Sequence, residues 1–362
     1  MTKRELYLKA LRNEQVDEIV WVPNFDYWLN VSHAEGTVPK QYLGMSRNDI
    51  VRAIGGTIWN RAEGLRSVCD PSVKETWRVD GTDRIYELET PIGTIREVSK
   101  QTEGRHRSTA ITEHFVKDLE TLQIMKYVVE ATHFEPNYSP TLKALEETGD
   151  YGVVLNPYFC VPFIQFAKMD TGYVNGFYMW MDYREEVDSL IKLYQEKYLE
   201  GYKILADGPA DVIASGDNMD GVMISPDIFK EYAVPFYLEA KKICSERNKI
   251  FEAHWCGRTQ SLLDLVPGCG LDVVEAIVTK PMADITLEDA IDKLRGEVVL
   301  QGGIPSVLVC NEGGSMEDFK KYIEEVILPL KGRKGFILGM SDNVPPNADF
   351  ERVERIADLI RN

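Results

Sequence analysis

The chain has 362 residues, of which 44% are hydrophobic, and this allows one barrel-sized domain or two medium ones with a large core. Its 58 acidic and 41 basic residues give a net charge of −17, which argues against nucleic acid or an anionic membrane surface as the main partner. The N-terminus lacks the apolar stretch of a signal peptide and no run of about 18 apolar residues suggests a membrane span, so we expect a cytoplasmic protein. Six cysteines spread over this length do not form a disulfide framework, and we expect them to be reduced.

The N-terminal part predicts a helix, a strand and a small β insertion. Apolar residues at helical spacing predict a helix over 2–12, and Val20–Asp26 is typical of a first strand. Three short β stretches over 76–99 are separated by turn residues, Asp80-Gly81 and a Pro-Ile-Gly sequence. We interpret 76–99 as an antiparallel β-meander inserted in the main domain.

Strands and helices alternate after residue 152. The predicted strands are 153–157, 211–218, 249–254, 271–275, 298–302 and 335–339, and helices are predicted at 184–200, 226–247, 287–294 and 316–328. This order predicts a parallel α/β fold, and a single (β/α)8 TIM barrel over 1–362 suits the length best. A doubly wound sheet is the alternative, but no Gly-x-Gly-x-x-Gly follows a strand.

A histidine and a cysteine stand two residues apart at the end of one predicted strand. Because side chains alternate along a strand, His254 and Cys256 point to the same side, as two ligands of one soft metal ion must. The alternative is a hydrogen-bonded core histidine beside an inert thiol. In a barrel, active-site groups gather where strands end, and Glu275 closes the next predicted strand. We expect zinc bound by His254, Cys256 and Glu275, with Cys310 in a later loop as the next candidate ligand and Asp342, which could instead cap the following helix, as a third.

Other polar and aromatic side chains follow the ends of predicted strands. Asp217 and Asn218 precede the strand bearing His254, and we expect them to orient substrate or to support the zinc site, with helix capping as the alternative. The aromatic residues would suit a flat methoxy-aromatic substrate, although such residues also pack cores. The candidate substrate-binding residues are Asn24, Phe25, Asp26, Trp28, Tyr158, Phe159 and Asp342.

Three motifs resemble those of the uroporphyrinogen decarboxylase superfamily, a (β/α)8 family. They are the His254–Gly257, Gly216–Asn218 and Gly302–Pro305 segments, and the resemblance spans most of the chain. Within the superfamily the chain is similar to zinc-dependent methyltransferases of corrinoid systems. That similarity implies Zn²⁺ as cofactor, a corrinoid-binding protein as partner, and a distal cysteine ligand. Here Ser341-Asp342 stands where the distal cysteine is expected, so either Cys310 or an oxygen ligand replaces it or the zinc is bound by fewer protein groups.

The resemblance has one further departure, which concerns substrate. Decarboxylase members carry an arginine-rich N-terminal motif, whereas Asn24–Asn30 contains no arginine, so we do not expect porphyrinogen decarboxylation. The leading hypothesis is a methyltransferase that demethylates a small O-methyl aromatic compound and methylates a corrinoid protein. A methylcorrinoid:thiol methyltransferase ranks second, and a non-catalytic barrel that binds a tetrapyrrole or a protein ranks third. A homodimer is compatible with the aromatic content.

Overall fold

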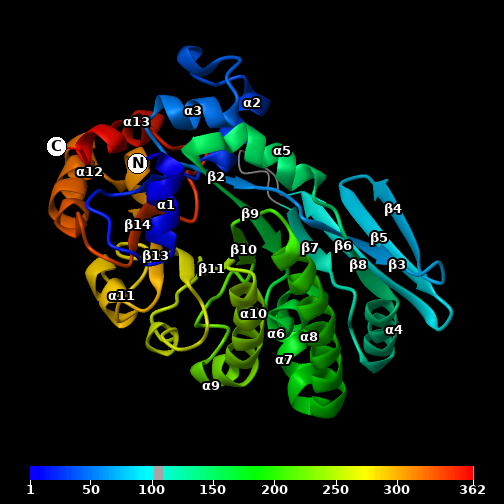
Figure 1. Cartoon of the computed structure of the whole chain (residues 1–362). Coiled ribbons are helices and arrows are strands. Elements are labelled where there is room, and N and C mark those ends of the chain that lie inside the picture. Colours follow the sequence, from blue (N-terminus) through cyan, green and yellow to red (C-terminus); the bar gives the residue numbers. More distant parts are fainter. Residues whose placement is uncertain (102–108, 362) are drawn as a thin grey trace.

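Eight parallel strands form the centre of the computed structural model, which describes residues 1–101 and 109–361 (Figure 1). Their order is β1-β14-β13-β12-β11-β10-β9-β2, and the Thr57 amide, just before β2, donates to the Trp21 carbonyl of β1 over 2.7 Å. The prediction of a (β/α)8 TIM barrel is thereby confirmed. The strands are β1 (Trp21–Val22), β2 (Ile58–Arg61), β9 (Gly152–Tyr158), β10 (Val212–Ser215), β11 (Ile250–His254), β12 (Val273–Ile277), β13 (Val299–Pro305) and β14 (Phe336–Ser341).

Helices surround this barrel and connect its strands (Figure 1). No helix among the described residues is long and apolar enough to span a membrane. The helices are α1 (Lys3–Leu11), α2 (Asp26–Glu35), α3 (Arg47–Ala53), α4 (Leu119–Glu130), α5 (Ser139–Thr148), α6 (Pro162–Ile164), α7 (Tyr173–Asp182), α8 (Arg184–Asp207), α9 (Pro226–Ile228), α10 (Val234–Glu246), α11 (Leu287–Lys293), α12 (Met316–Tyr322) and α13 (Phe350–Leu359).

Helix α1 closes the N-terminal end of the barrel. It begins at a capping box in which Thr2 and Glu5 bond to each other's backbone amides, and it buries Tyr7 and Leu11 completely. These side chains join a core cluster with the inward-facing apolar residues of the strands, and the Tyr7 hydroxyl donates to Gln301 Oε1 over 2.7 Å. The barrel floor is therefore filled with side chains, and the end that remains for chemistry is the mouth at the carboxyl ends of the strands.

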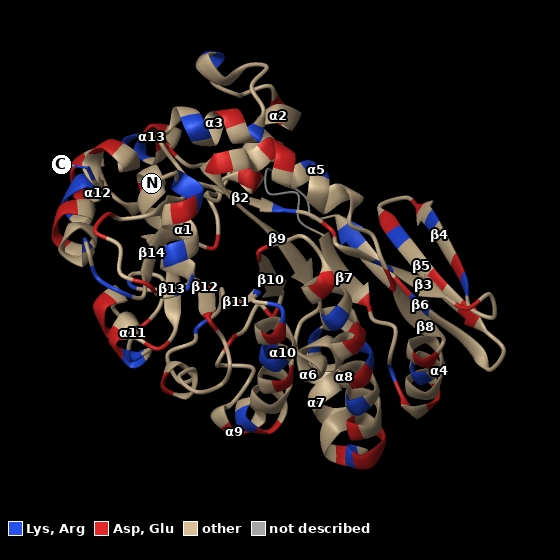
Figure 2. Cartoon of the chain, viewed as in Figure 1, with Lys and Arg blue, Asp and Glu red and all other residues tan. Residues whose placement is uncertain are grey.

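A small antiparallel sheet is appended to the barrel. Strands β4 (Lys74–Asp80), β5 (Asp83–Thr90), β6 (Gly93–Gln101) and β7 (Thr109–Glu113) pair in chain order, and the predicted β region over 76–99 falls on the first three. Strands β3 (Leu65–Cys69) and β8 (Thr132–Pro136) form a separate antiparallel pair. Acidic and basic residues are mixed over the appended sheet and along α8 (Figure 2).

The structure corrects several predicted boundaries. The helix predicted over 226–247 is divided into α9, a π turn η4 (Phe229–Ala233) and α10, because Pro235 has no amide to donate. The strand predicted over 20–26 is reduced to the two residues of β1, since α2 already begins at Asp26. Strand β2 was not predicted, because its four residues include only two apolar ones.

Candidate active site

His254 and Cys256 lie together at the barrel mouth. His254 is the last residue of β11, and its side chain is 18% exposed. Its Nδ1 donates to Glu275 Oε2 over 2.5 Å, and its Nε2 lies 3.7 Å from Asp342 Oδ1. The Cys256 thiol donates to Asn218 Oδ1 over 3.3 Å. Three other parts of the chain, represented by Asn218, Glu275 and Asp342, thus contact either this imidazole or this thiol.

Glu275 occupies a different place from the one predicted. Strand β12 continues to Ile277, with a shift of register between Glu275 and Ile277 and a φ of +67° at Ala276. The prediction that Glu275 closes the strand is therefore wrong by two residues, because a bulge does not interrupt an apolar stretch in sequence. Glu275 is 3% exposed and lies in register with His254. Its carboxylate holds the His254 ring instead of pointing freely out of the barrel.

The charges around His254 favour its protonated form when no metal is bound. Burial alone would lower the pKa of His254, but the Glu275 carboxylate, followed by Cys256, outweighs burial and raises this pKa to about 11. Glu252 lies two residues earlier on the same face of β11, and burial followed by Glu275 raises its pKa to about 8. Sequence reasoning missed Glu252, although the Glu252, His254, Cys256 alternation would have identified it.

Left-handed backbone conformations surround the imidazole. Asn218, Ala276 and Asp342 have φ values of +46°, +67° and +81°, a region that non-glycine residues seldom adopt. Such conformations persist where surrounding contacts hold them, and they gather at functional sites. Here Asn24 Nδ2 donates to the Asp342 carbonyl over 2.7 Å. Asn24, a predicted substrate contact, therefore fixes the loop that presents Asp342.

Asp217 lies beneath the mouth and has no exposed surface. Its Oδ1 accepts from the Val161 amide and the Ser215 hydroxyl, each over 2.8 Å, and its Oδ2 accepts from the Tyr237 hydroxyl. These bonds tie the loop after β9 to the loop after β10. Burial raises the pKa of Asp217. Asp217 therefore positions the loop that carries Asn218, whereas Asn218 itself is exposed and contacts Cys256.

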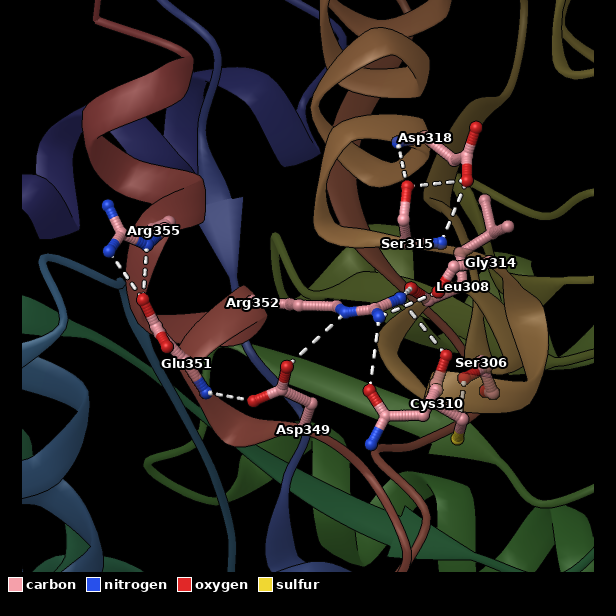
Figure 3. A network of polar contacts seen from close by, with 11 residues as sticks. Ser306, Leu308, Cys310, Gly314, Ser315, Asp318, Asp349, Glu351, Arg352 and Arg355 are labelled. Atoms are coloured by element: carbon pink, nitrogen blue, oxygen red, sulfur yellow. Dashed lines mark hydrogen bonds and ion pairs between the residues drawn. The ribbon is translucent and has the colours of Figure 1, made fainter.

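Cys310 lies in a loop stabilised from α13 (Figure 3). Its sulfur is 3.6 Å from the Ser306 carbonyl oxygen and 3.7 Å from Asn347 Oδ1, and its own carbonyl accepts from Arg352 Nη1 over 3.0 Å. In the described part of the chain no contact joins this sulfur to His254 or Cys256. The structure does not bring Cys310 into the cluster, and its role as a ligand stays a prediction.

The predicted aromatic contacts separate into buried and accessible residues. Phe25 and Trp28 are 0% and 5% exposed, and Trp28 stacks on Phe350 of α13 with ring centroids 3.8 Å apart. Both residues pack in the core, the alternative that sequence reasoning left open. Tyr158 is also buried, at 8% exposure, whereas Phe159 is 37% exposed.

Asp26 pairs with a basic residue near the N-terminal end of α2. Its Oδ1 accepts from Arg47 Nε over 2.8 Å, and the Arg47 guanidinium lies 5.7 Å from the centre of the Phe25 ring. This ion pair joins α2 to α3. It occupies one carboxylate oxygen of Asp26, which was predicted to contact substrate.

The donor set at the mouth fits a zinc ion only in part. Imidazole nitrogen and thiolate sulfur are zinc ligands, and a carboxylate on Nδ1 is the usual support of a ligand histidine. Within residues 1–101 and 109–361, however, no three His, Cys, Asp or Glu side chains are already grouped as a metal site. Asp342 is a candidate for a third protein ligand, because its Oδ1 lies 3.7 Å from Nε2 while its Oδ2 accepts from Asn343 Nδ2 over 2.9 Å.

The barrel and its mouth define a TIM-barrel protein with a polar site at the strand ends. The chain belongs to the uroporphyrinogen decarboxylase (URO-D) family, whose model matches residues 111–362. No curated protein matches the chain significantly. A methyltransferase from Methanosarcina mazei has a similar structure, with a TM-score of 0.60 and 15% identity, covering 100% of this chain and 98% of that one. A D-psicose 3-epimerase from Clostridium cellulolyticum H10 gives a TM-score of 0.33 and 12% identity, covering 65% of this chain and 82% of its own.

Proposed function

We propose that the chain is a zinc-dependent methyltransferase that moves a methyl group from a small O-methyl aromatic compound to a corrinoid carried by a partner protein. The observation that carries the proposal is the position of His254 at the barrel mouth, with Nε2 3.7 Å from Asp342 Oδ1 and the Cys256 thiol beside the same imidazole. Membership of the URO-D family and the fold shared with a methyltransferase support it. Phe25 and Trp28 pack in the core, and the more accessible Phe159 lines a cavity beside the barrel that His254 does not line.

In this proposal His254, Cys256 and Asp342 would hold the zinc ion. Glu275 Oε2 accepts a hydrogen bond from Nδ1–H, so Nε2 is the ring nitrogen that faces the mouth, and its lone pair would bind the metal once its proton is released. Glu275 is therefore reassigned from ligand to positioning residue. A bound zinc ion supplies a Lewis acid that draws electron density from the ether oxygen of the substrate. Asn218 Oδ1 accepts a hydrogen bond from the Cys256 thiol, and when the thiolate binds the metal this oxygen would be available to orient a polar group of the substrate.

Metal content of purified protein is the first test of this site. We expect about one zinc per chain in the wild type, as for a single mononuclear site, with loss in Cys256→Ala and a large reduction in Asp342→Ala. Cys269→Ala is the matched control, because this cysteine is 1% exposed and lies in the turn before β12, at the other end of the barrel. Retained zinc in Cys256→Ala would contradict the ligand set. Loss in Cys310→Ala would restore Cys310 as a ligand.

Methyl transfer is tested separately with a corrinoid protein reduced to its cobalt(I) state. We expect a methoxy-aromatic compound to convert the cobalt(I) spectrum to that of methylcobalt, with release of the matching phenol. The His254→Ala variant should lose this conversion while its circular dichroism spectrum is unchanged. Activity only with methylcobalamin and a thiol would reverse the ranking and support the thiol methyltransferase. Failure of both assays with stoichiometric zinc would leave a metal-binding barrel of another function.

A further inference from the structure

A second cavity lies beside the barrel, between it and the appended sheet. It measures about 360 Å³, and its walls come from α4, β3, β5, β8, α8 and the π turn η3 (Gln165–Asp170). We call it the side cavity. Neither His254 nor Cys256 is among its lining residues. Its size is at the lower end of the range of small-molecule sites, which suits a ligand with one ring.

Aromatic rings form much of the wall. Phe159 stacks on Tyr198 of α8 with centroids 4.6 Å apart and ring planes 15° apart, and Phe134 contacts Phe159 at 5.8 Å. On the side of the appended sheet, Tyr86 meets Phe115 at 5.5 Å in an edge-to-face arrangement. Such faces and edges favour a flat aromatic ligand over an aliphatic one of equal size.

One hydroxyl in this wall lacks a partner. Tyr198 is 4% exposed and lines the cavity, yet its hydroxyl makes no hydrogen bond within the described part of the chain. This hydroxyl is not among the fully buried polar atoms without a partner, so water in the cavity can reach it, and a ligand hydroxyl would take the place of that water. Asp170 lies nearby in the same wall, with Oδ1 accepting from Gln165 Nε2 and Oδ2 from the Tyr194 hydroxyl, each over 2.8 Å.

The charged groups of the wall oppose ligands of either sign. The Lys197 ammonium donates to the carbonyls of Glu130 and Thr132, over 3.1 and 2.8 Å, and disfavours a ligand cation. Glu75, which accepts from the Tyr86 hydroxyl over 2.6 Å, disfavours a ligand anion. Because the two charges are of opposite sign and both already have partners, the wall offers no free charge that would select a charged ligand over a neutral one.

We propose that the side cavity binds a neutral, one-ring phenol, with its ring beside Phe159 and its hydroxyl bonded to Tyr198. The inference does not rest on the proposed function, because the cavity, its aromatic wall and the unpaired hydroxyl are separate from the His254 cluster. The released product of demethylation belongs to the same chemical class. The side cavity is thus a second ligand site of the protein, distinct from the barrel mouth.

Isothermal titration calorimetry with four small probes tests the ligand class. We expect para-cresol to bind the wild type more tightly than toluene, which lacks the hydroxyl, and more tightly than benzylamine or benzoate, which carry opposite charges. No cresol binding up to millimolar concentration would overturn the proposal. Tighter binding of benzylamine than of cresol would also overturn it, because the site would then select cations.

Matched variants test the position of the ligand. Tyr198→Phe removes only the free hydroxyl, and we expect it to weaken cresol binding by about tenfold while toluene binding is unchanged. Tyr178→Phe is the control, since Tyr178 is 65% exposed on α7 and does not line the cavity. His254→Ala should bind cresol as the wild type does, whatever its metal content. Equal cresol binding in Tyr198→Phe, or its loss in His254→Ala, would show that the phenol binds elsewhere.

Discussion

Oε2 of Glu275 lies 2.5 Å from Nδ1 of His254, and the two residues are in register on the neighbouring strands β12 and β11. Because both residues are held by the strand pairing of the barrel, Nδ1 faces Glu275 and Nε2 faces the mouth. A carboxylate on Nδ1 fixes the ring orientation and raises the basicity of Nε2. Rigid strands hold this pair, whereas Asn218 and Asp342 follow the ends of their strands.

The pairing predicts that Glu275 tunes the metal site without binding the metal. We expect Glu275→Ala to reduce zinc affinity by about 10–100-fold, because the His254 ring loses its support. Glu275→Gln should retain part of the affinity, since its amide oxygen still accepts from Nδ1. Competition with a chelator measures both. Glu288→Gln, at the exposed start of α11, is the control, and unchanged zinc affinity in Glu275→Ala would contradict the positioning role.

Arg352 is predicted to be a major contributor to stability. It is 2% exposed, and its guanidinium donates to the carbonyls of Leu308, Cys310 and Gly314 over 2.8 to 3.0 Å (Figure 3). Replacement by Met leaves these acceptors without a partner, and we expect the free energy of unfolding to fall by about 3 kcal/mol or more. Urea denaturation followed by circular dichroism measures the change.

Arg355, three residues later on the same helix, supplies the control for that substitution. It pairs with Glu351 one turn away, and both side chains are about half exposed, at 50% and 54%. Arg355→Met should therefore change the free energy of unfolding by roughly 0.5 kcal/mol or less. Equal losses in the two variants would mean that the buried network is not the source of the Arg352 effect.

Asp170 makes stability depend on pH. Burial raises its pKa from 3.8 to about 7, so the folded chain holds this proton more tightly than the unfolded chain does. The contribution of Asp170 to the free energy of unfolding is therefore fully present below pH 3.8, its pKa in the unfolded chain, and is lost as the pH rises toward 7. Asp170→Asn should therefore gain stability relative to the wild type over this interval, by up to about 4 kcal/mol.

Urea denaturation across the same pH interval measures this difference. Gln165 and Tyr194 donate to Asp170, and the Asn variant loses one of these hydrogen bonds at every pH. The ionisation of Asp170 is therefore measured by how the difference in unfolding free energy between the two proteins changes with pH. Asp227→Asn is the control, because the Asp227 side chain is 96% exposed. A pH-independent difference for Asp170→Asn would show that Asp170 is ionised throughout the interval.

Gly201 and Tyr158 test whether a predicted substrate contact is structural. A Cβ on Gly201 would lie 1.7 Å from the Tyr158 hydroxyl, which is buried and has no hydrogen-bond partner among the described residues. Gly201→Ala should cost about 1–3 kcal/mol of stability by overpacking, and adding Tyr158→Phe should recover part of it. Thermal unfolding of both variants and the double variant measures the coupling. If Tyr158→Phe alone impairs substrate binding at full stability, Tyr158 contacts substrate.

The sequence allowed the barrel and half of its candidate site to be predicted. Strand β11 was predicted to within one residue, at 249–254 against the observed Ile250–His254, because Ile250, Phe251 and Ala253 are apolar and Gly257 follows soon after the strand. The bulge at Ala276 was not predictable, since a left-handed residue in an apolar strand leaves no mark on composition. The contact between Nε2 of His254 and Asp342 was not predictable either, because it depends on how two distant loops meet in space.

The side chains that fill the N-terminal end of the barrel determine how molecules can enter and leave the site at the other end. Tyr7 and Leu11 block the N-terminal end, so no through-channel passes along the barrel axis. A small molecule that reaches His254 along the barrel axis must therefore enter and leave through the mouth at the carboxyl ends of the strands. A macromolecule bound over this mouth would block the exit of any small molecule bound beneath it. If a macromolecule binds over the mouth in this way, we expect an ordered mechanism. The small molecule would bind before the macromolecule, and its product would leave after the macromolecule dissociates.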